Sequence, residues 1–308
     1  MKLSIITINY NNAEGLRKTL ASVAAQTYRD IEHIIIDGGS TDGSVDVIKE
    51  YVSANPPKDS FFKHTIYWVS EKDTGIYNAM NKGLEIALGR RVVNSFNRSE
   101  QSEDKNKVLP DYIQILNSGD ILAAPDVTER MKNTLYSLHH TPYTDDAPGI
   151  IYGNMIKNDY ATGKIVGKSR EVEYSLRQYY SSTMNHDCCY IRRDVFDTYG
   201  LYDENLKIVS DWKWFLLAIG LGKVEPIYVD IDVTIFDASG ISETNLELRH
   251  KERRLVLEEL LPPAVLADYD SHAFDAEQMN RLRRHHLYGL VYFMERVLFK
   301  LEKWHIIK

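Results

Sequence analysis

The chain has 308 residues, of which 44% are hydrophobic and 26% are charged, and its formal net charge is -7. This composition excludes an intrinsically disordered or collagen-like protein, and the length is sufficient to bury a substantial core. The acidic balance argues against a general nucleic-acid-binding protein, so we expect no nucleic-acid partner. The two cysteines, Cys188 and Cys189, are adjacent and form no C-x-x-C pair, which argues against a disulfide framework and a zinc ribbon.

The first 90 residues alternate between apolar, β-branched runs and segments in which apolar residues recur at helical spacing. The runs predict buried strands, and the spaced segments predict amphipathic helices. Strands are expected over residues 3–8, 31–37 and 65–70, and helices over 14–26, 44–52 and 76–88. Strands that alternate with helices predict a mostly parallel sheet covered on both faces and joined by right-handed crossovers.

Residues 90–110 interrupt this alternation with a polar stretch, which we expect to be a surface insertion. Further strands are expected over residues 111–116, 150–157, 164–168, 188–192 and 224–233, and further helices over 125–139, 193–199 and 210–219. Beyond about Ile241 the pattern becomes helical, over residues 246–261 and 276–304. We therefore expect an α/β domain over residues 1–240 and a helical tail over 241–308.

Polar residues follow each of the first four expected strands, and open α/β sheets bind ligands in the crevice at those strand ends. Asp37 either faces the crevice, where it could bind a nucleobase or a ribose hydroxyl, or caps the next helix. The sequence contains neither GxGxxG nor GxxxxGK[ST], which argues against a nicotinamide dehydrogenase and a P-loop kinase. The strand ends therefore predict a ligand site of another kind.

Two more aspartates have a chemical and a structural interpretation. Asp120 could hold a hard divalent cation on the phosphates of a nucleotide, or it could belong to a simple Ser-Gly-Asp turn. Asp211 could be a general base, or a first-turn acid favoured by the helix dipole. The neighbouring Trp212 suits a sugar face and core packing equally, and His186 could be structural or catalytic.

Four passages of the sequence resemble the family 2 glycosyltransferases, the large inverting group with the GT-A fold. The first runs from Ser4 to Gly43 and includes SIITINYN and IDGGSTDG. The second is SEKDTGIYNAMNKG at residues 70–83, the third is LNSGD at 116–120, and the fourth runs more loosely from His186 to Trp212. Their order and spacing are specific. They cover roughly residues 1–240 and look closest to the bacterial subgroup that builds O-antigen, capsule or exopolysaccharide.

The resemblance implies an inverting transferase of the hexosyltransferase type, with an α/β GT-A sheet flanked by helices. It would move a sugar from a nucleotide-sugar donor, most often a UDP-sugar, to a hydroxyl of a glycan or a lipid-linked saccharide. The donor-binding residues that the resemblance implies are Thr7, Asn9, Tyr10, Asp37, Gly38, Lys72, Asp73, Gly75 and Asn81. Among these, Asp37 would contact the base.

The resemblance also implies the residues of the reaction centre. Asp211 falls at the position of the catalytic base, and His186 and Trp212 are candidates for the acceptor side. Asp120 falls at the last acid of the D-x-D metal motif, so the implied cofactor is Mn²⁺ or Mg²⁺. The motif here reads Ser-Gly-Asp, so its first acid is missing and metal affinity is expected to be weak. The chemistry needs a base for the acceptor hydroxyl and a cation for the leaving diphosphate, and no covalent intermediate.

The tail has a different character. Residues 280–308 contain seven Lys or Arg and two Glu among many apolar and aromatic side chains, which gives this segment a net charge of +5. A basic amphipathic helix over residues 276–308 is typical of a peripheral membrane contact, and also of a helix packed on the catalytic domain or in a homodimer. We find no signal peptide and no apolar run long enough to span a bilayer, so we expect a cytoplasmic protein, with the inner membrane face as the surface it would contact.

Two other functions compete with glycosyl transfer. The missing first acid at Ser118 would suit a catalytically inactive protein of the same fold that binds a sugar nucleotide or acts as a scaffold. A nucleotidyltransferase would normally show a Gly-rich loop with Arg or Lys after the first strand. That loop reads Asn-Tyr-Asn-Asn here, and its first cation is Arg17.

Overall fold

The computed structural model describes residues 1–55, 65–93, 108–139, 147–159, 164–172, 174–237, 245–284 and 288–303. The chain divides into two compact units, Met1–Arg253 and Arg254–Lys308, which we describe separately. Most of the expected 90–110 insertion, residues 94–107, lies outside the described residues.

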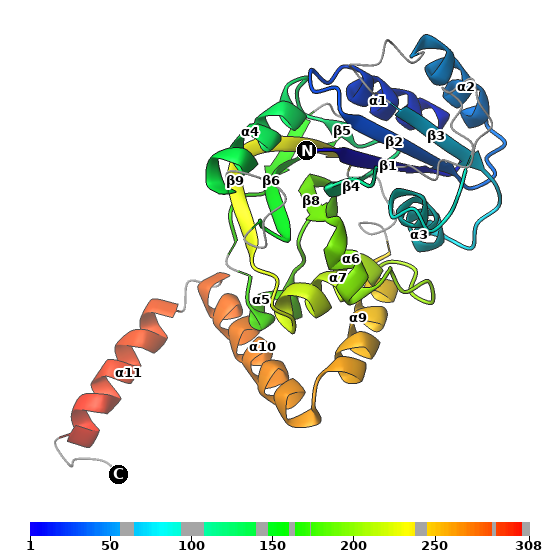
Figure 1. Ribbon diagram of the computed structural model, residues 1–308. Helices are drawn as coiled ribbons and strands as arrows, with labels where there is room; N and C mark the ends of the chain where they lie inside the picture. The colour runs from blue at the N-terminus through cyan, green and yellow to red at the C-terminus, as the bar shows by residue number, and fades with distance from the viewer. Residues whose placement is uncertain are drawn as a thin grey trace. The chain divides into compact units, whose positions relative to one another are not determined.

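Nine strands of the described chain form one mixed sheet in the first unit (Figure 1). Its order is β3-β2-β1-β4-β8-β6-β9-β5, and β7 pairs with β6. The strands are β1 (Leu3–Asn9), β2 (Ile31–Asp37), β3 (Thr65–Ser70), β4 (Tyr112–Asn117), β5 (Ile121–Leu122), β6 (Ile150–Asp159), β7 (Lys164–Lys168), β8 (Cys189–Arg192) and β9 (Pro226–Asp237). The half that contains β1 to β4 is parallel, whereas β8 runs antiparallel to both β4 and β6.

Helices cover both faces of the parallel half, with α1 and α2 on one face and α3 on the other (Figure 1). The alternation of side chains along the strands explains this arrangement. Ile35 packs in one apolar cluster with Leu16 of α1 and Val47 of α2. Its neighbour Ile36 points to the opposite face, toward α3, where Gly83 leaves room for the strands: a Cβ at Gly83 would lie only 2.4 Å from a methyl of Ile6.

The helices of the first unit are α1 (Ala13–Ala24), α2 (Ser44–Ala54), α3 (Ile76–Ala87), α4 (Val127–His139), α5 (Leu176–Ser181), α6 (Arg193–Tyr199) and α7 (Ser210–Phe215). Apart from α5, which was not expected, and α7, which ends early, they begin and end close to the expected positions. The α/β GT-A fold predicted from the sequence is confirmed. The sequence did not predict β5 or α5, because two- and six-residue elements are too short to show a period.

Three boundaries differ from expectation in ways that affect the site. The strand expected from Cys188 begins instead with a 3₁₀ turn, η1 (His186–Cys188). The helix expected over residues 210–219 is α-helical only to Phe215 and continues as a π-helical turn, η2 (Leu216–Gly220). Strand β9 extends four residues beyond the expected end, to Asp237, and this extension brings another carboxylate to the sheet edge.

The helical tail consists of α9 (Leu246–Leu260), which begins in the first unit and ends in the second, then α10 (Pro263–Arg284) and α11 (Tyr288–Lys303). A proline at the first position of α10 suits a helix start, because its missing N–H would be unpaired there in any case. Within the second unit, Arg254 of α9 pairs with Asp270 of α10 at 2.8 Å. None of the described helices is both long enough and apolar enough to cross a membrane.

Candidate active site

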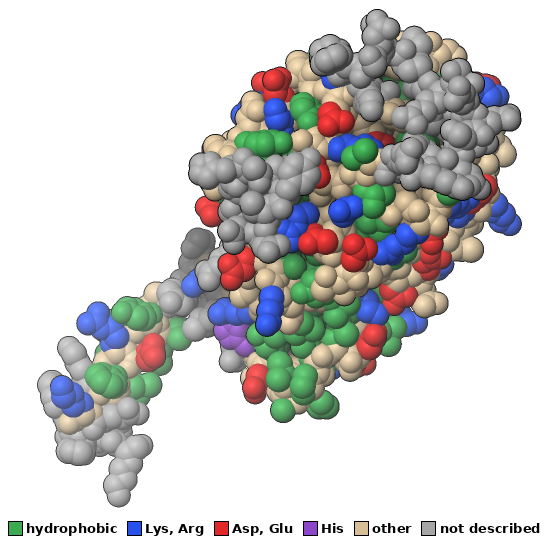
Figure 2. All heavy atoms as spheres, in the orientation of Figure 1, with side chains coloured by type: hydrophobic (Ala, Val, Ile, Leu, Met, Phe, Trp, Pro, Cys, Tyr) green, Lys and Arg blue, Asp and Glu red, His purple; other side chains and the backbone are tan. Residues whose placement is uncertain are grey.

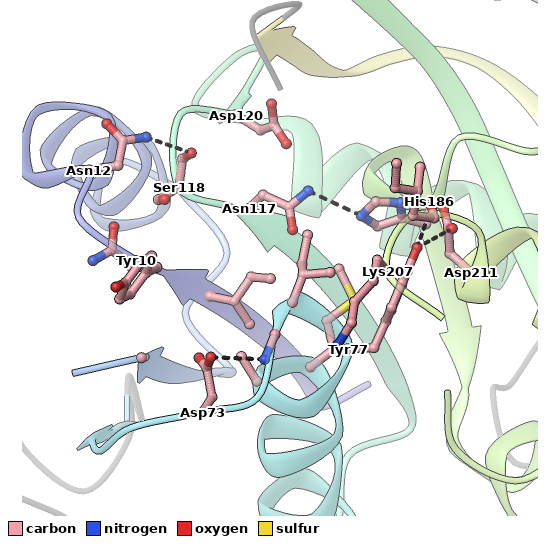
Figure 3. A pocket seen from close by; sticks show the side chains of 18 of the residues that line it. Tyr10, Asn12, Asp73, Tyr77, Asn117, Ser118, Asp120, His186, Lys207 and Asp211 are labelled. Carbon is pink, nitrogen blue, oxygen red and sulfur yellow. Dashed lines mark hydrogen bonds and ion pairs between the residues drawn. The ribbon is translucent and has the colours of Figure 1, made fainter. Parts of the chain in front are cut away.

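A cavity of about 820 Å³ opens at the carboxyl ends of β1, β2 and β4 (Figure 3). The chain order of the parallel strands explains its position. From β1 the chain moves outward to β2 and β3, whereas β4 lies on the other side of β1. The loops after β1 and β4 therefore leave in different directions, and such a switch point leaves a crevice in open α/β sheets. Asn12 spans this crevice, because its side chain caps α1 at Gly15 and donates a hydrogen bond to the carbonyl of Ser118 at 3.0 Å.

Nine of the thirteen site residues expected from the sequence line this cavity: Asn9, Tyr10, Gly38, Lys72, Asp73, Gly75, Asp120, His186 and Asp211. Among the residues expected to bind the donor, Tyr10 lies at the rim with 65% of its surface exposed. A Cβ at Gly38 would lie 2.3 Å from the Asp73 carboxylate, so glycine allows these two loops to meet. Burial raises the pKa of Asp73, and the charge of Asp37 adds to this effect.

The buried side chain of Asn9 has one polar atom without a partner. Its Nδ2 donates to Asp37 Oδ1 at 2.8 Å and to Ser40 Oγ at 3.2 Å. Its Oδ1 is buried and makes no hydrogen bond with any described residue. Because a buried acceptor without a donor is unfavourable, this atom is suited to accept a hydrogen bond from a ligand in the cavity.

Asp37 does not line the cavity. Its Oδ1 accepts from Asn9 and from the Ser40 hydroxyl, and its Oδ2 accepts from the Ser70 hydroxyl at 2.7 Å and from the Ser40 amide at 3.0 Å. Burial alone would raise the pKa of Asp37, but the hydrogen bonds from Ser40, Ser70 and Asn9 outweigh it and lower the pKa. Asp37 therefore ties together the ends of three strands. Its expected contact with a base remains a prediction, and it would require one of these donors to give way.

Three other expected site residues also lie outside the cavity lining. Thr7 Oγ1 lies 3.0 Å from Nε2 of His33, a buried residue of β2. Asn81 donates to and accepts from the backbone of Tyr202, at 2.8 and 2.9 Å. Trp212 is buried, and its indole N–H donates to the carbonyl of Tyr179 at 2.8 Å. In the structure, Trp212 therefore packs in the core, which was one of its two interpretations.

Asp211 stands at the first turn of α7 and is held from two sides (Figure 3). The Tyr77 hydroxyl lies 2.8 Å from Asp211 Oδ1, and His186 Nδ1 lies 3.3 Å from Asp211 Oδ2. Burial by itself raises the pKa of Asp211, but the hydrogen bonds and charge of its partners, above all His186, lower it below the ordinary aspartate value. The carboxylate is therefore ionised at neutral pH, and it lines the cavity.

The other nitrogen of His186 faces Asn117, at the end of β4. Asn117 Nδ2 lies 3.4 Å from His186 Nε2. With Asn117 donating to Nε2, the ring carries its proton on Nδ1 and presents that N–H to Asp211. Burial lowers the pKa of His186, but the adjacent Asp211 outweighs this and raises it. Asn117, at the end of β4, thus orients the His186 ring that contacts Asp211.

Asp120 is buried, with only 3% of its surface exposed. Its Oδ1 accepts from the backbone N–H of Asp237 at 2.9 Å, and its Oδ2 is buried without a hydrogen bond to any described residue. Burial raises the pKa of Asp120 well above the ordinary value, and the charge of the nearby Asp187 adds to this. A carboxylate so placed is stabilised in its charged form only if a cation approaches it.

The residues around Asp120 fit a divalent cation that takes most of its ligands from a substrate. In the described chain, no group of three or more His, Cys, Asp or Glu is placed to hold a metal alone. The Asp237 carboxylate also lines the cavity and lies beside Gly119, where a Cβ would be 3.3 Å from its Oδ2. Mg²⁺ and similar ions commonly use one or two carboxylates together with substrate phosphates and water.

Several cavity-lining residues were not among the expected site residues, and four of them bear on the chemistry: Asn12, Tyr77, Lys207 and Asp237. Asp237 could have been found, because alternating apolar residues continue past Val233 and would have carried the strand to it. The other three gave no such signal. Lys207, for example, lies in an irregular loop and reaches the carbonyl of Thr74 at 3.3 Å, a contact across 133 residues.

Comparisons with known proteins agree with this architecture. Among solved structures, the chain is similar to Staphylococcus aureus TarS 1–349 in complex with UDP, with a TM-score of 0.56, 17% identity, and coverage of 92% of this chain and 74% of that one. It covers 43% of a longer TarS chain. It is also similar to the mannosyltransferase PcManGT of Pyrobaculum calidifontis in complex with GDP-Man and Mn²⁺, with a TM-score of 0.56, 13% identity, and coverage of 98% and 82%. These likenesses define the class of fold.

Sequence comparison gives more specific relatives than the comparison of folds. Residues 4–95 match the model of Glycosyl transferase family 2. An uncharacterized glycosyltransferase of Mycobacterium tuberculosis is 29% identical over 245 residues, which cover 78% of this chain and 76% of the relative. A PGL/p-HBAD biosynthesis glycosyltransferase of the same species is 23% identical over 251 residues, which cover 81% and 82%. The match and the fold together support the resemblance to family 2 that the motifs indicated.

Proposed function

We propose that the protein is an inverting glycosyltransferase of the hexosyltransferase type, which moves a sugar from a nucleotide-sugar donor to a hydroxyl of an acceptor saccharide. One observation carries this proposal. A single cavity in the GT-A crevice joins residues at the ends of β1 to β3 with a half-buried, ionised Asp211 and an unpaired Asp120 oxygen.

Asp211 is the proposed catalytic base. It accepts the proton of the acceptor hydroxyl while the hydroxyl oxygen forms a bond to the anomeric carbon. The bond from that carbon to the phosphate oxygen breaks, and the nucleoside diphosphate leaves with the electron pair. A single in-line displacement inverts the anomeric configuration. Tyr77 and His186 are positioning residues, because they hold the two carboxylate oxygens in place and leave the remaining lone pairs for the acceptor.

The donor is proposed to lie over the ends of β1 to β3, and a UDP-sugar is the favoured class. Asn9 Oδ1, buried and unpaired, can accept the N–H of a base such as uracil, and Tyr10 at the rim can stack on its ring. Asp73 can accept hydroxyls of the ribose or the sugar, and Lys72 and Lys207 supply positive charge for the diphosphate. TarS has been solved with UDP and with UDP-GlcNAc, which supports this class of donor.

A divalent cation, Mn²⁺ or Mg²⁺, is proposed to be held by Asp120 with Asp237 beside it. Bound there with the donor, such an ion would neutralise charge on the leaving diphosphate. The structural neighbour PcManGT, solved with GDP-Man and Mn²⁺, supports a cation in this fold. Ser118 replaces the first acid of the motif, so tight binding of the ion is expected only together with donor phosphates.

The acceptor is proposed to be a glycan or lipid-linked saccharide of cell-surface polysaccharide synthesis, such as O-antigen or capsule. The PGL/p-HBAD biosynthesis glycosyltransferase of Mycobacterium tuberculosis, a relative at 23% identity, supports a biosynthetic role for the transfer. Asp211 lies on the cavity wall opposite the donor-side loops, with His186 next to it, so the acceptor hydroxyl would enter from the α7 side.

The proposal is tested in two steps. The melting temperature is measured with a panel of nucleotide sugars in the presence of Mn²⁺, and binding of at least one is expected to raise it. Release of the nucleoside diphosphate is then measured with that donor and a panel of saccharide acceptors. A donor that stabilises the chain without any transfer or hydrolysis would favour the inactive, sugar-nucleotide-binding alternative. Stabilisation by no nucleotide sugar would overturn the proposal.

A further inference from the structure

Helix α11 presents a large apolar surface. Eight of its residues are exposed to between 40% and 66%: Leu290, Val291, Tyr292, Phe293, Met294, Val297, Leu298 and Phe299. Figure 2 shows hydrophobic side chains next to Lys and Arg on this helix. Exposure of so many large apolar side chains on one short element is unusual for a soluble monomer and indicates a surface that is covered in use.

These residues are not spread evenly around the helix. At 100° per residue, positions 290, 291, 293, 294, 297, 298 and 301 form one continuous apolar arc of about 160°. Met294 lies near its centre. Phe299 and Tyr292 lie on the opposite face. The arc is therefore wider than a coiled-coil seam, which uses two positions in seven.

Basic residues lie on the face opposite this arc. Arg296 and Lys303 fall about 60° and 80° beyond the edge of the arc at Phe293, and the Arg296 guanidinium lies 5.9 Å from the centre of the Tyr292 ring. The helix is 16 residues long, which corresponds to about 24 Å at 1.5 Å per residue. A bilayer core is about 30 Å thick, and no described helix meets the requirements of a span. An amphipathic helix of this kind lies in the plane of a membrane surface.

The distribution of charge along the chain favours an anionic lipid surface as the partner of α11. Residues 280–308 carry +5 and the whole chain carries -7, so residues 1–279 carry -12. An anionic lipid surface attracts the tail and repels the rest of the chain, so contact through the tail is favoured. Helix α11 itself carries only +1, and the rest of the positive charge lies in residues 281–284 and at Lys308. Association of two copies through α11 would bring two basic segments near each other, whereas docking on lipid headgroups of opposite charge would not. We infer that α11 docks this protein in the plane of an anionic lipid bilayer, with its apolar arc in the acyl region and Arg296 and Lys303 at the headgroups.

Flotation of the full chain with vesicles tests this inference independently of sugar transfer. With vesicles of phosphatidylcholine and phosphatidylglycerol at about two to one, the protein is expected to float. With phosphatidylcholine alone, and at about 0.5 M salt, binding is expected to fall by about tenfold or more, because the basic residues contribute through lipid charge. Failure to float with anionic vesicles would overturn the inference.

Two matched variants test the orientation. Met294→Glu places a charge at the centre of the apolar arc and is expected to lower binding by about tenfold or more. Phe299→Glu adds the same charge on the opposite face and is expected to retain most of the binding. Equal losses in the two variants would contradict an in-plane helix with this arc in the lipid. Helix content is measured by circular dichroism, and a value equal to that of the wild type is the control that both variants keep α11 folded.

Light scattering of the same proteins tests whether a second copy of the chain, instead of lipid, covers the apolar arc of α11. The wild type is expected to be monomeric without lipid at the concentration used for flotation. A wild-type dimer that Met294→Glu converts to a monomer would assign the arc to a second copy and overturn the lipid inference. Transfer to a water-soluble acceptor is expected to be unchanged in Met294→Glu, so a failed membrane test leaves the proposed function standing.

Discussion

Replacing Tyr77 with phenylalanine removes the hydroxyl that contacts Asp211 and keeps the aromatic ring. The Tyr77 side chain is 4% exposed, so the ring is expected to stay in place. Its hydroxyl lies 2.8 Å from Asp211 Oδ1 and 2.6 Å from the carbonyl of Ile208, so one proton serves two acceptors. A hydrogen bond to a charged group contributes about 1.5–3 kcal/mol, and we take the lower value because the proton is shared.

The expected effect is on the pH dependence of the reaction. The Tyr77 hydroxyl lowers the pKa of Asp211, so its removal raises that pKa. About 1.5 kcal/mol corresponds to about one pH unit. Because the base acts only when ionised, activity is lost as the pH falls through its pKa. The acid limb of kcat/KM, measured as nucleoside diphosphate release, should therefore move about one pH unit toward neutral.

Tyr202→Phe is the matched control for this variant. Tyr202 is also buried, and its ring centre lies 5.8 Å from that of Tyr77. Its hydroxyl has no hydrogen-bond partner among the described residues, so its removal should leave the acid limb in place. An acid limb that stays at the wild-type position in Tyr77→Phe, or that moves equally in both variants, would refute the role given to Tyr77.

The remaining predictions address the three aspartates Asp211, Asp120 and Asp37 directly. Asp211→Asn should lower kcat by about a hundredfold or more while the donor still raises the melting temperature, and a near wild-type rate would remove Asp211 from the role of base. Excess EDTA should abolish transfer, and Asp120→Asn should weaken Mn²⁺ binding in the presence of UDP, measured by calorimetry, by about tenfold; unchanged values would contradict a cation at Asp120. Asp37→Asn should lower the free energy of unfolding in urea by about 1–3 kcal/mol at neutral pH. Because folding lowers the pKa of Asp37, that difference should shrink as the pH falls below about 4, and a difference independent of pH would argue against an ionised Asp37.

The sequence predicted the elements that have a clear period and clear limits. Strand β3 begins at Thr65 and ends at Ser70, as expected, because a β-branched run there is bounded by polar residues. The antiparallel pairing of β8 with β4 and β6 was not predicted, since period-2 alternation does not report strand direction. The resemblance to known motifs, rather than any period, singled out Asp120 and Asp211.

The sequence by itself determined where strands and helices form and which polar residues follow the strands, because both depend on neighbours within a few positions. Only the tertiary structure decided what those polar residues do. Asp37 ends a strand and Asp73 follows one, but donors from β1, β3 and the loop after β2 surround Asp37, whereas Asp73 lines the cavity. Asp211 owes its lowered pKa above all to His186, and also to Tyr77, which is 134 residues away along the chain. Hydrogen bonds of this kind depend on how distant segments pack, and no local pattern encodes them.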